Sequence, residues 1–564
     1  MRKRKGEEKL MVTDKQIADL IFPDVDSDLS KLEAKYPERN LPEGAEVTRF
    51  APSPTGFLHT GSLFTSLICH KVAKDSKGVF FVRLEDTDTK REIEGSGLQL
   101  LEQLKLFNIV PDEGYLGDRE EGNYGPYIQS KRANIYKVVI KHLLENGRAY
   151  PCFCSQAELD DIRNKQEKAK IIPGYYGPFA KCRYLTNDER YERIKRGDAF
   201  VIRFKSNGNH IRKIKVHDLV HGDFEIAQND MDIVIYKSDG LPTYHFAHAC
   251  DDHFMRTTTV IRGEEWIASL PIHIELFESL GWKAPKYAHL PVIMKIGENG
   301  NKRKLSKRLD SEAAVSYFLE DGYPTEALIM YLMTIANSNF EEWIFAHKFE
   351  HMEEFEFSFS KMSLEGALFD MGKLNFFSRE ILAKKSKEEM LDMTLSYSKK
   401  YDQKLYDLVN SDPEYFKKII NIEREKENPR KDYEKLGGLY DLISFFYNDL
   451  YDKYVKENGL TYNEKFDISL IKEVLTSLRD NLDISLDEQN WFSNMKDIGE
   501  KLGFSSDRKA YKANPEAYKG MIGDVAEMLR ITLTTKKNSP NLYYVMQVLG
   551  KEECDRRINL VLAK

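Results

Sequence analysis

Two segments of the chain carry residue types that could bind and activate phosphate groups. The first, Pro52 to Ser62, places Gly56, His59 and Gly61 in a loop that leads into an expected helix. Such a loop gathers backbone N–H groups and the positive end of a helix at one point, where a phosphate binds. Glycine lets the backbone approach closely, and the imidazole adds a donor. Alone, this spacing is unspecific, and a loop histidine without a role is the competing interpretation.

The second segment is the basic run Lys304 to Arg308 (KLSKR), which follows a loop containing Gly297 and Gly300. Two lysines three residues apart, Lys304 and Lys307, would form a mobile clamp for a triphosphate whose negative charge rises in the transition state. An isolated basic pentamer is ordinarily a solvated turn. The two segments therefore indicate nucleotide chemistry only if the fold brings them to one cleft.

The elements around the first segment predict a β-α-β unit. Val47 to Phe50 fits a short buried strand, a helix should begin near Gly61, and Val79 to Leu84 fits a strand buried in a parallel sheet. A second block, from about 231 to 309, contains expected strands at 233–236 and 258–262. Together the two blocks predict a multidomain α/β protein with a doubly wound, Rossmann-like parallel sheet.

The residue pattern divides the chain into six segments. We expect an N-terminal extension, two α/β halves separated by an α+β insertion, and helical regions after them. The expected bounds are 1–45 for the extension, 46–130 and 241–310 for the halves, 131–240 for the insertion, 311–385 for a helical connecting domain and 386–564 for an all-α C-terminal region. Near the end, apolar stripes predict two helices, the second of which stops at Gly550.

Composition bounds the class of protein. The 564 residues are 41% apolar and 31% charged, which excludes a mostly disordered chain, and the formal net charge of −7 argues against a histone-like coat on nucleic acid. Six cysteines are too few for a disulfide scaffold. We find no targeting segment and no apolar run near the ~20 residues of a membrane helix, so we expect a cytoplasmic protein without a membrane partner.

Taken together, the motifs resemble those of a known family. His59-Thr60-Gly61-Ser62 and Lys304-Leu305-Ser306-Lys307-Arg308 correspond to the HIGH and KMSKS motifs of class I aminoacyl-tRNA synthetases. The chain resembles the glutamyl-tRNA synthetases of bacterial type, clearly over residues 46–380. Further matching segments are Arg49–Gly56, Arg83–Asp88, Asp239–Ala247, Val260–Trp266 and Leu529–Thr534. The resemblance implies that the insertion binds the tRNA acceptor stem and that the helical region 386–564 binds the anticodon.

The resemblance also implies a two-step reaction. The α-carboxylate of L-glutamate attacks the α-phosphate of ATP, with Mg²⁺ neutralising the pyrophosphate, and the glutamyl group then passes to the terminal adenosine of tRNA(Glu). His59, Lys304 and Lys307 would be catalytic, and the enzyme would be a monomer that needs bound tRNA to activate glutamate. The residues implied for ATP binding are Gly56, His59, Gly61, Ser62, Glu265, Trp266, Lys304, Ser306 and Lys307.

A glutamate site needs a group that prefers a carboxylate to an amide. A guanidinium forks onto a carboxylate, and Arg49 and Arg262 both end expected strands, where ligands of α/β sheets bind. The resemblance gives Arg49 the γ-carboxylate and Glu85 the ammonium. The implied set is Arg49, Ser53, Glu85, Tyr244, His248 and Arg262. His248 departs from the family, which usually has Asn there, and a protonated imidazole would attract a carboxylate.

The insertion contains a candidate zinc site. Cys152, Cys154 and Cys182 supply three thiols, and Tyr175 could supply the fourth ligand that tetrahedral Zn²⁺ requires. Some glutamyl-tRNA synthetases and a truncated relative carry a similar Cys-x-Cys…Tyr…Cys pattern, with a shorter gap between the tyrosine and the last cysteine. Three unpaired cytosolic cysteines are the alternative.

Other functions compete with a ligase for tRNA(Glu). A non-discriminating enzyme would also charge tRNA(Gln), a difference that depends on the anticodon-reading residues. A truncated enzyme that glutamylates a modified tRNA base, or a small-molecule adenylating enzyme, would lack the helical region after 385. A non-catalytic tRNA-binding paralogue would not need His59, Lys304 and Lys307, all of which are present.

Overall fold

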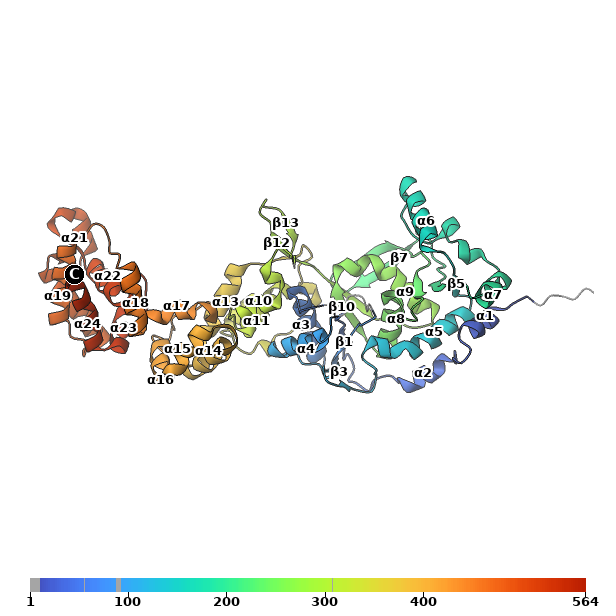
Figure 1. Ribbon diagram of the computed structural model, residues 1–564, viewed down its shortest axis with the longest axis horizontal. Coiled ribbons are helices and arrows are strands. Elements are labelled where there is room, and N and C mark those ends of the chain that lie inside the picture. Colours follow the sequence, from blue (N-terminus) through green and yellow to red (C-terminus); the bar gives the residue numbers. More distant parts are fainter. Residues whose placement is uncertain (1–10, 55, 88–92, 307, 564) are drawn as a thin grey trace, which may run out of the picture. The chain divides into compact units, whose positions relative to one another are not determined.

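The computed structural model describes residues 11–54, 56–87, 93–306 and 308–563 (Figure 1). The chain forms two compact units. The first comprises the chain up to Tyr317 together with Ile329–Asp370, and the second comprises Phe318–Leu328 and the chain from Met371. Across the described ranges, we find no helix with the length and apolar character needed to cross a membrane.

The β-α-β unit expected around residue 60 is confirmed. Strand β1 (Val47–Phe50) is wholly buried, helix α3 (Thr60–Asp75) follows the loop, and β2 (Val79–Val82) pairs with β1 in parallel. After helix α4 (Ser96–Leu106), β3 (Glu113–Tyr115) extends the sheet in parallel and β4 (Glu120–Glu121) closes it antiparallel. Gly78 is required before β2, because a Cβ there would lie 1.9 Å from the carbonyl oxygen of Glu46.

The second half of the α/β domain joins the first through β10 (Thr259–Gly263). The backbone N–H of Thr258 donates to the carbonyl of Val47 at 3.0 Å, so β10 begins beside β1. Strand β11 (Lys286–Leu290) pairs with β10 in parallel, and β7 (Lys213–Asp218), which forms a hairpin with β8 (Gly222–Ala227), pairs with β11. Helices α8 (Tyr244–Phe254) and α9 (Leu270–Ser279) flank these strands in sequence.

The insertion has its own antiparallel sheet of β5 (Ala149–Cys152), β6 (Val201–Phe204) and β9 (Val234–Tyr236). Helices α6 (Gln156–Lys168) and α7 (Asn187–Lys195) lie between its first two strands in sequence. The block expected from about 231 included β9, whereas the expected insertion bounds 131–240 also contain it; β9 pairs with β6, so it belongs to the insertion sheet. Helix α5 (Ala133–Glu145), at the start of the expected insertion, packs into a hydrophobic cluster that contains residues of both the insertion sheet and the α/β halves.

The N-terminal residues are part of this core. Helix α1 (Asp14–Ile21) contains Ala18 and ends before Phe22, and helix α2 (Leu29–Lys35) ends before Tyr36. These three residues are buried in the cluster that contains the apolar face of α5. The Lys141 ammonium of α5 donates to the carbonyls of Phe22 at 3.0 Å and Val25 at 2.8 Å. Residues 14–36 of the extension therefore contribute to the hydrophobic core of the first unit.

The basic segment follows a small hairpin. Strand β12 (Ile293–Ile296) pairs antiparallel with β13 (Lys302–Lys304) and parallel with β14 (Ala367–Leu368). Three helices lie between β13 and β14 in sequence: α10 (Val315–Glu320), α11 (Thr325–Ala336) and α12 (Phe340–Ala346).

The second unit is helical except for a two-stranded pair, β15 (Phe504–Ser505) and β16 (Gly520–Met521). The two expected C-terminal helices are α22 (Ile522–Thr534) and α23 (Leu542–Leu549), which Gly550 ends at φ +80°. The other α-helices are α13 (Met371–Lys384), α14 (Lys387–Tyr401), α15 (Gln403–Ser411), α16 (Pro413–Ile420), α17 (Leu439–Ile443), α18 (Asn448–Asn458), α19 (Ile468–Asn481), α20 (Glu488–Lys501), α21 (Arg508–Ala513) and α24 (Lys551–Leu562).

Candidate active site

His59 is the N-cap residue of α3. Its Nδ1 accepts the backbone N–H of Ser62 at 3.0 Å, so the ring proton is on Nε2, which lies 2.7 Å from the Ser62 hydroxyl. Gly61 leaves room for the ring, since a Cβ there would approach Nδ1 to 3.2 Å. The imidazole is thus held at the positive end of a sixteen-residue helix.

One cavity of about 1090 Å³ joins the two halves of the α/β domain. His59 and Lys304, from loops far apart in the sequence, both line it, as the two-segment hypothesis requires. Other expected site residues on its wall are Arg49, Ser53, Gly61, Ser62, Glu85, Tyr244, Arg262, Glu265 and Trp266. Of the remaining expected residues, Gly56, Ser306 and His248 are described but do not line the cavity, and Lys307 lies outside the described residues.

The basic loop is anchored by a buried carboxylate. Asp310 accepts a forked pair of hydrogen bonds from Arg303 at 2.6 and 2.7 Å and the backbone N–H of Ser306 at 2.8 Å. The hydrogen bonds from Arg303 hold the pKa of Asp310 well below its usual range. Ser306 therefore shapes the loop through its backbone, while the Lys304 ammonium lies 3.7 Å from the exposed Glu265 carboxylate.

Arg49 and Glu85 belong to a buried network of charges. Arg49 Nε lies 3.1 and 3.2 Å from the two oxygens of Asp252, and Arg83 bridges Asp252 at 2.7 Å to Glu85 at 3.0 Å. Burial would raise the pKa of Asp252, but Arg49 and Arg83 hold it well below the usual range. Burial raises the pKa of Glu85 despite the nearby Arg83. A substrate ammonium beside this carboxylate would lower its pKa again.

Arg262, at the end of β10, has different partners. Its Nε donates to His289 Nε2 at 3.1 Å, its Nη2 lies 3.2 Å from His273 Nδ1, and its guanidinium stands 5.1 Å from the ring centre of Tyr287. Its buried Nη1 has no hydrogen-bond partner among the described residues. Such a donor, on a cavity wall, is suited to an anionic ligand.

His248 does not present a charge to the cavity. Tyr244, one turn earlier on α8, lines the cavity with its ring 4.4 Å from that of Trp266. His248 is fully buried, with Nδ1 2.7 Å from an oxygen of Asp252 and Nε2 3.3 Å from the Tyr287 hydroxyl. Burial lowers the pKa of His248 to about 3, so the ring is neutral at pH 7.

Several residues of the site were missed by sequence reasoning. Thr87, Gln129, Lys237 and Asp239 also line the cavity. Lys237 donates to the Thr87 carbonyl at 3.2 Å and lies 3.0 Å from Asp239, which precedes the Gly-Leu-Pro segment that matches the family. The buried partners Asp252, His273 and His289 gave no local signal, because each acts through a contact with a distant residue.

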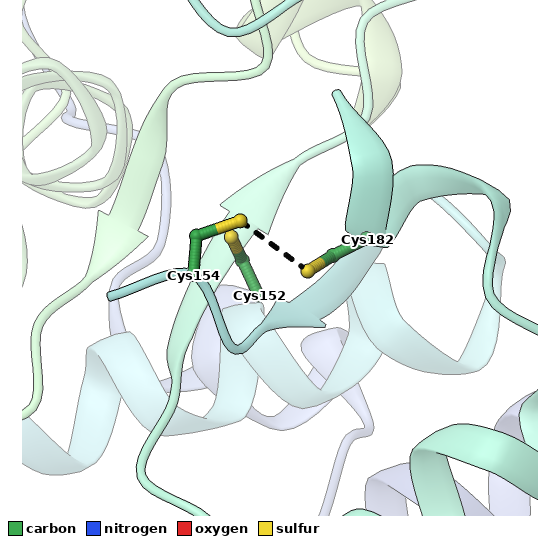
Figure 2. Close-up of side chains that lie close together, drawn as sticks. All are labelled: Cys152, Cys154 and Cys182. Carbon is green, nitrogen blue, oxygen red and sulfur yellow. Dashed lines mark hydrogen bonds between the residues drawn. The ribbon is translucent and has the colours of Figure 1, made fainter. Parts of the chain in front are cut away.

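The three insertion cysteines converge with their sulfur atoms facing one another (Figure 2). Cys154 Sγ lies 3.7 Å from Cys182 Sγ, and Tyr175 Oη lies 3.2 Å from Cys154 Sγ and 3.5 Å from Cys152 Sγ. Ligands about 2.3 Å from a tetrahedral Zn²⁺ would be about 3.8 Å apart, so the donor set fits this ion. Hydrogen bonds within the cluster lower the pKa of the Cys152 thiol and raise that of Cys154, and burial together with these bonds raises that of Tyr175, so the negative charge of the metal-free cluster is concentrated on Cys152.

The basic residues near this cluster are largely engaged within the protein. Arg183 pairs with Asp232 at 2.6 Å, and the buried Arg190 donates to the carbonyl of Arg183 at 3.0 Å. Arg193 and Arg196 both pair with Asp198, at 2.8 and 2.7 Å. A nucleic-acid phosphate would have to compete with these acceptors.

Comparison with known proteins agrees with the geometry. Residues 46–376 match the catalytic domain of class I tRNA synthetases (E and Q), and residues 389–562 match an anticodon-binding domain. Glutamate–tRNA ligase of Clostridium perfringens strain 13 is 45% identical over 543 residues, covering 96% of this chain and 99% of the relative. That of Acetivibrio thermocellus is 42% identical over 549 residues, covering 97% and 100%.

A solved structure extends the likeness to the whole fold. The glutamate-tRNA synthetase of Elizabethkingia anophelis has a TM-score of 0.71 at 29% identity and covers 92% of this chain and 100% of its own. The match to the catalytic domain includes the His59 loop, the basic segment Lys304–Arg308 and every cavity residue named above. The chain therefore belongs to the class I aminoacyl-tRNA synthetases, in the branch of the glutamate–tRNA ligases.

Proposed function

We propose that this chain joins L-glutamate to the 3′ end of tRNA(Glu) at the expense of ATP, through a glutamyl-adenylate. The observation that carries the proposal is the shared cavity: a phosphate-binding helix start at His59, a lysine at 304 and the unused guanidinium donor of Arg262 line one space. A triphosphate and an amino-acid dicarboxylate are anionic ligands that suit these positive groups.

In the first step the protein positions reactants and stabilises charge. Arg49 and Arg262 take carboxylates of glutamate, and Glu85 takes its ammonium. An oxygen of the α-carboxylate attacks the α-phosphorus, the bond to the β-phosphate breaks, and pyrophosphate leaves with the electron pair. The start of α3, with His59 at its N-cap, and Lys304 line the space in which charge develops on the phosphates. Lys307 belongs to the same basic segment and is assigned the same role.

Mg²⁺ would be held mainly by the nucleotide. The metal-type clusters among the described residues are Cys152 with Cys154 and Cys182, and the exposed His351 with Glu353 and Glu354, and neither group lines the cavity. Phosphate oxygens are the usual partners of this ion. When bound, it supplies charge neutralisation for the pyrophosphate leaving group.

In the second step the 2′-hydroxyl of the terminal adenosine attacks the glutamyl carbonyl and releases AMP. The insertion would hold the acceptor stem and the helical second unit the anticodon. Zn²⁺, bound by Cys152, Cys154, Cys182 and Tyr175, would fix the fold of the insertion rather than take part in the reaction. We propose that the enzyme works as a monomer in the cytoplasm.

Aminoacylation of tRNA(Glu) and tRNA(Gln) transcripts, side by side with radiolabelled glutamate, tests this function. Charging of tRNA(Glu) alone is the expected result. Charging of both would identify a non-discriminating enzyme, and charging of neither, with no exchange of pyrophosphate into ATP, would refute the ligase. Arg262→Leu should raise the KM for glutamate far more than the KM for ATP. The matched control Arg119→Leu removes an exposed arginine that is not on the cavity wall.

A further inference from the structure

The structure assigns a positioning role in glutamate recognition to two buried histidines: His289 and His273 hold the Arg262 guanidinium toward the cavity by accepting its hydrogen bonds with neutral rings. This inference rests on the proposed function and deepens it. Neither histidine lines the cavity, so both act through Arg262 rather than on the substrate.

The protonation of both rings follows from the chemistry of arginine. A guanidinium only donates hydrogen bonds, so His289 Nε2 and His273 Nδ1 must each present a lone pair. The proton of His289 is therefore on Nδ1, 2.7 Å from the buried carboxylate of Asp218, and that of His273 is on Nε2, 3.0 Å from His245 Nδ1. Asp218 is itself fixed by the backbone N–H groups of Val220 and His221, each at 3.0 Å.

Burial keeps the two rings in this neutral state. It lowers the pKa of His273 well below its usual range and also lowers the pKa of His289, against the opposing effect of Asp218. A protonated ring would place an N–H against the guanidinium and lose the hydrogen bond. A series of hydrogen bonds thus runs from Asp218 through His289, Arg262 and His273 to His245, and a donor faces an acceptor at each contact.

Because the groups that accept its hydrogen bonds are neutral, the positive charge of Arg262 can attract an anionic ligand. Arg49 and Arg83 share the Asp252 carboxylate, and Arg83 also pairs with Glu85, so their charge is partly compensated within the protein. Arg262 forms no ion pair with any carboxylate of the described residues, and its Nη1 has no partner there. A carboxylate in the place of either imidazole would hold the side chain equally well but would cancel the attraction for an anionic substrate.

The two histidines offer a geometric test, because amide side chains mimic the two ring nitrogens separately. A glutamine oxygen reaches the position of Nε2, and an asparagine oxygen reaches that of Nδ1. His289→Gln and His273→Asn therefore keep an acceptor oxygen within hydrogen-bond distance of Arg262, and we call them matched-reach variants. His289→Asn and His273→Gln also carry an amide, but its oxygen does not lie where Arg262 donates, and we call them wrong-reach variants. His289→Leu and His273→Leu remove the acceptor altogether.

We expect the leucine and wrong-reach variants to raise the KM for glutamate about tenfold or more, with the KM for ATP within about twofold of wild type. The matched-reach amides should recover most of the glutamate affinity. Thermal unfolding of each variant separates recognition from folding, and the amide pairs keep the test valid if the leucine variants fail to fold. An equal glutamate KM for matched and wrong-reach amides would overturn the inference. An inactive wild type would instead refute the proposed function.

Discussion

The Thr60 hydroxyl donates a hydrogen bond to the backbone carbonyl of Glu312 at 2.7 Å, across 252 residues of sequence. Thr60 is the first residue of α3, directly after His59, and Glu312 follows the basic loop by a few residues. An isolated β-bridge between His59 and Ala314 strengthens the same junction. The start of α3 is therefore joined to residues that closely follow the basic loop, by contacts that form without a nucleotide.

Thr60→Val should weaken this junction. Valine keeps the shape but leaves the buried Glu312 carbonyl unpaired, which should lower the free energy of unfolding by about 1–2 kcal/mol. Because the His59 loop and the basic loop are then held less firmly relative to each other, the KM for ATP should rise several-fold in pyrophosphate exchange with tRNA present. Thr48→Val is the matched control, since the Thr48 hydroxyl also donates to a buried carbonyl, that of Cys69, at 2.7 Å. If both variants changed the ATP KM alike, the junction would have no role in nucleotide binding.

Asp310→Asn should slow adenylate formation. The change removes the negative charge that accepts hydrogen bonds from Arg303 and from the Ser306 N–H. The interaction energy that holds the loop should fall by about 1.5 kcal/mol. If that energy is needed to place the loop in the transition state, the rate should fall about tenfold. The KM for glutamate should not change, because Arg262 lies on β10. Asp112→Asn, which loses a carboxylate bound to the Phe80 N–H away from the cavity, serves as control. A normal kcat in the Asp310 variant would contradict the anchoring role.

His248→Asn should make the free energy of unfolding of the first unit less dependent on pH in mild acid. The folded pKa of His248 is about 3 and its unfolded value is near 6.5, so the neutral ring favours folding above pH 6.5, and this contribution is lost as the pH falls. Between about pH 7 and pH 5 the wild type should lose about 2 kcal/mol relative to the variant, by urea unfolding. The partly exposed His142, on α5, gives the control His142→Asn. Parallel pH curves for wild type and His248→Asn would show that burial does not disfavour the charged ring.

Zinc should co-purify with the protein at about one ion per chain and survive dialysis. Cys154→Ser should abolish it and lower the melting temperature of the insertion, since structural zinc contributes directly to folding. Cys250→Ala removes a buried thiol outside the cluster and should leave the metal content unchanged. Elemental analysis of the three proteins decides the matter: a metal-free wild type would establish the alternative of three unpaired thiols.

Local patterns predicted the parts of the fold that depend on neighbouring residues. The four-residue strand before the His59 loop, the helix after it and the Gly550 helix stop all follow from hydrophobic period and glycine placement. The partner of β9 could not be predicted, because strand pairing depends on long-range contacts that no local period encodes. The same holds for the site. Arginines at strand ends could be recognised in the sequence, but not the buried Asp252, which pairs with Arg49, or His289, which accepts a hydrogen bond from Arg262.

The family match begins at residue 46, yet the fold of the first unit begins earlier. Tyr36 donates to the Gly125 carbonyl at 2.9 Å, and the Asn187 side chain of the insertion donates to Asp14 at 2.9 Å. A fragment trimmed to the family boundary would uncover the apolar side of α5 and leave Lys141 without its carbonyl acceptors. Such a fragment should aggregate on expression, whereas one that starts at residue 11 keeps the surface intact. The family boundary at residue 46 thus cuts through one hydrophobic core, although the glutamate–tRNA ligases of 42–45% identity align over 96–97% of the chain.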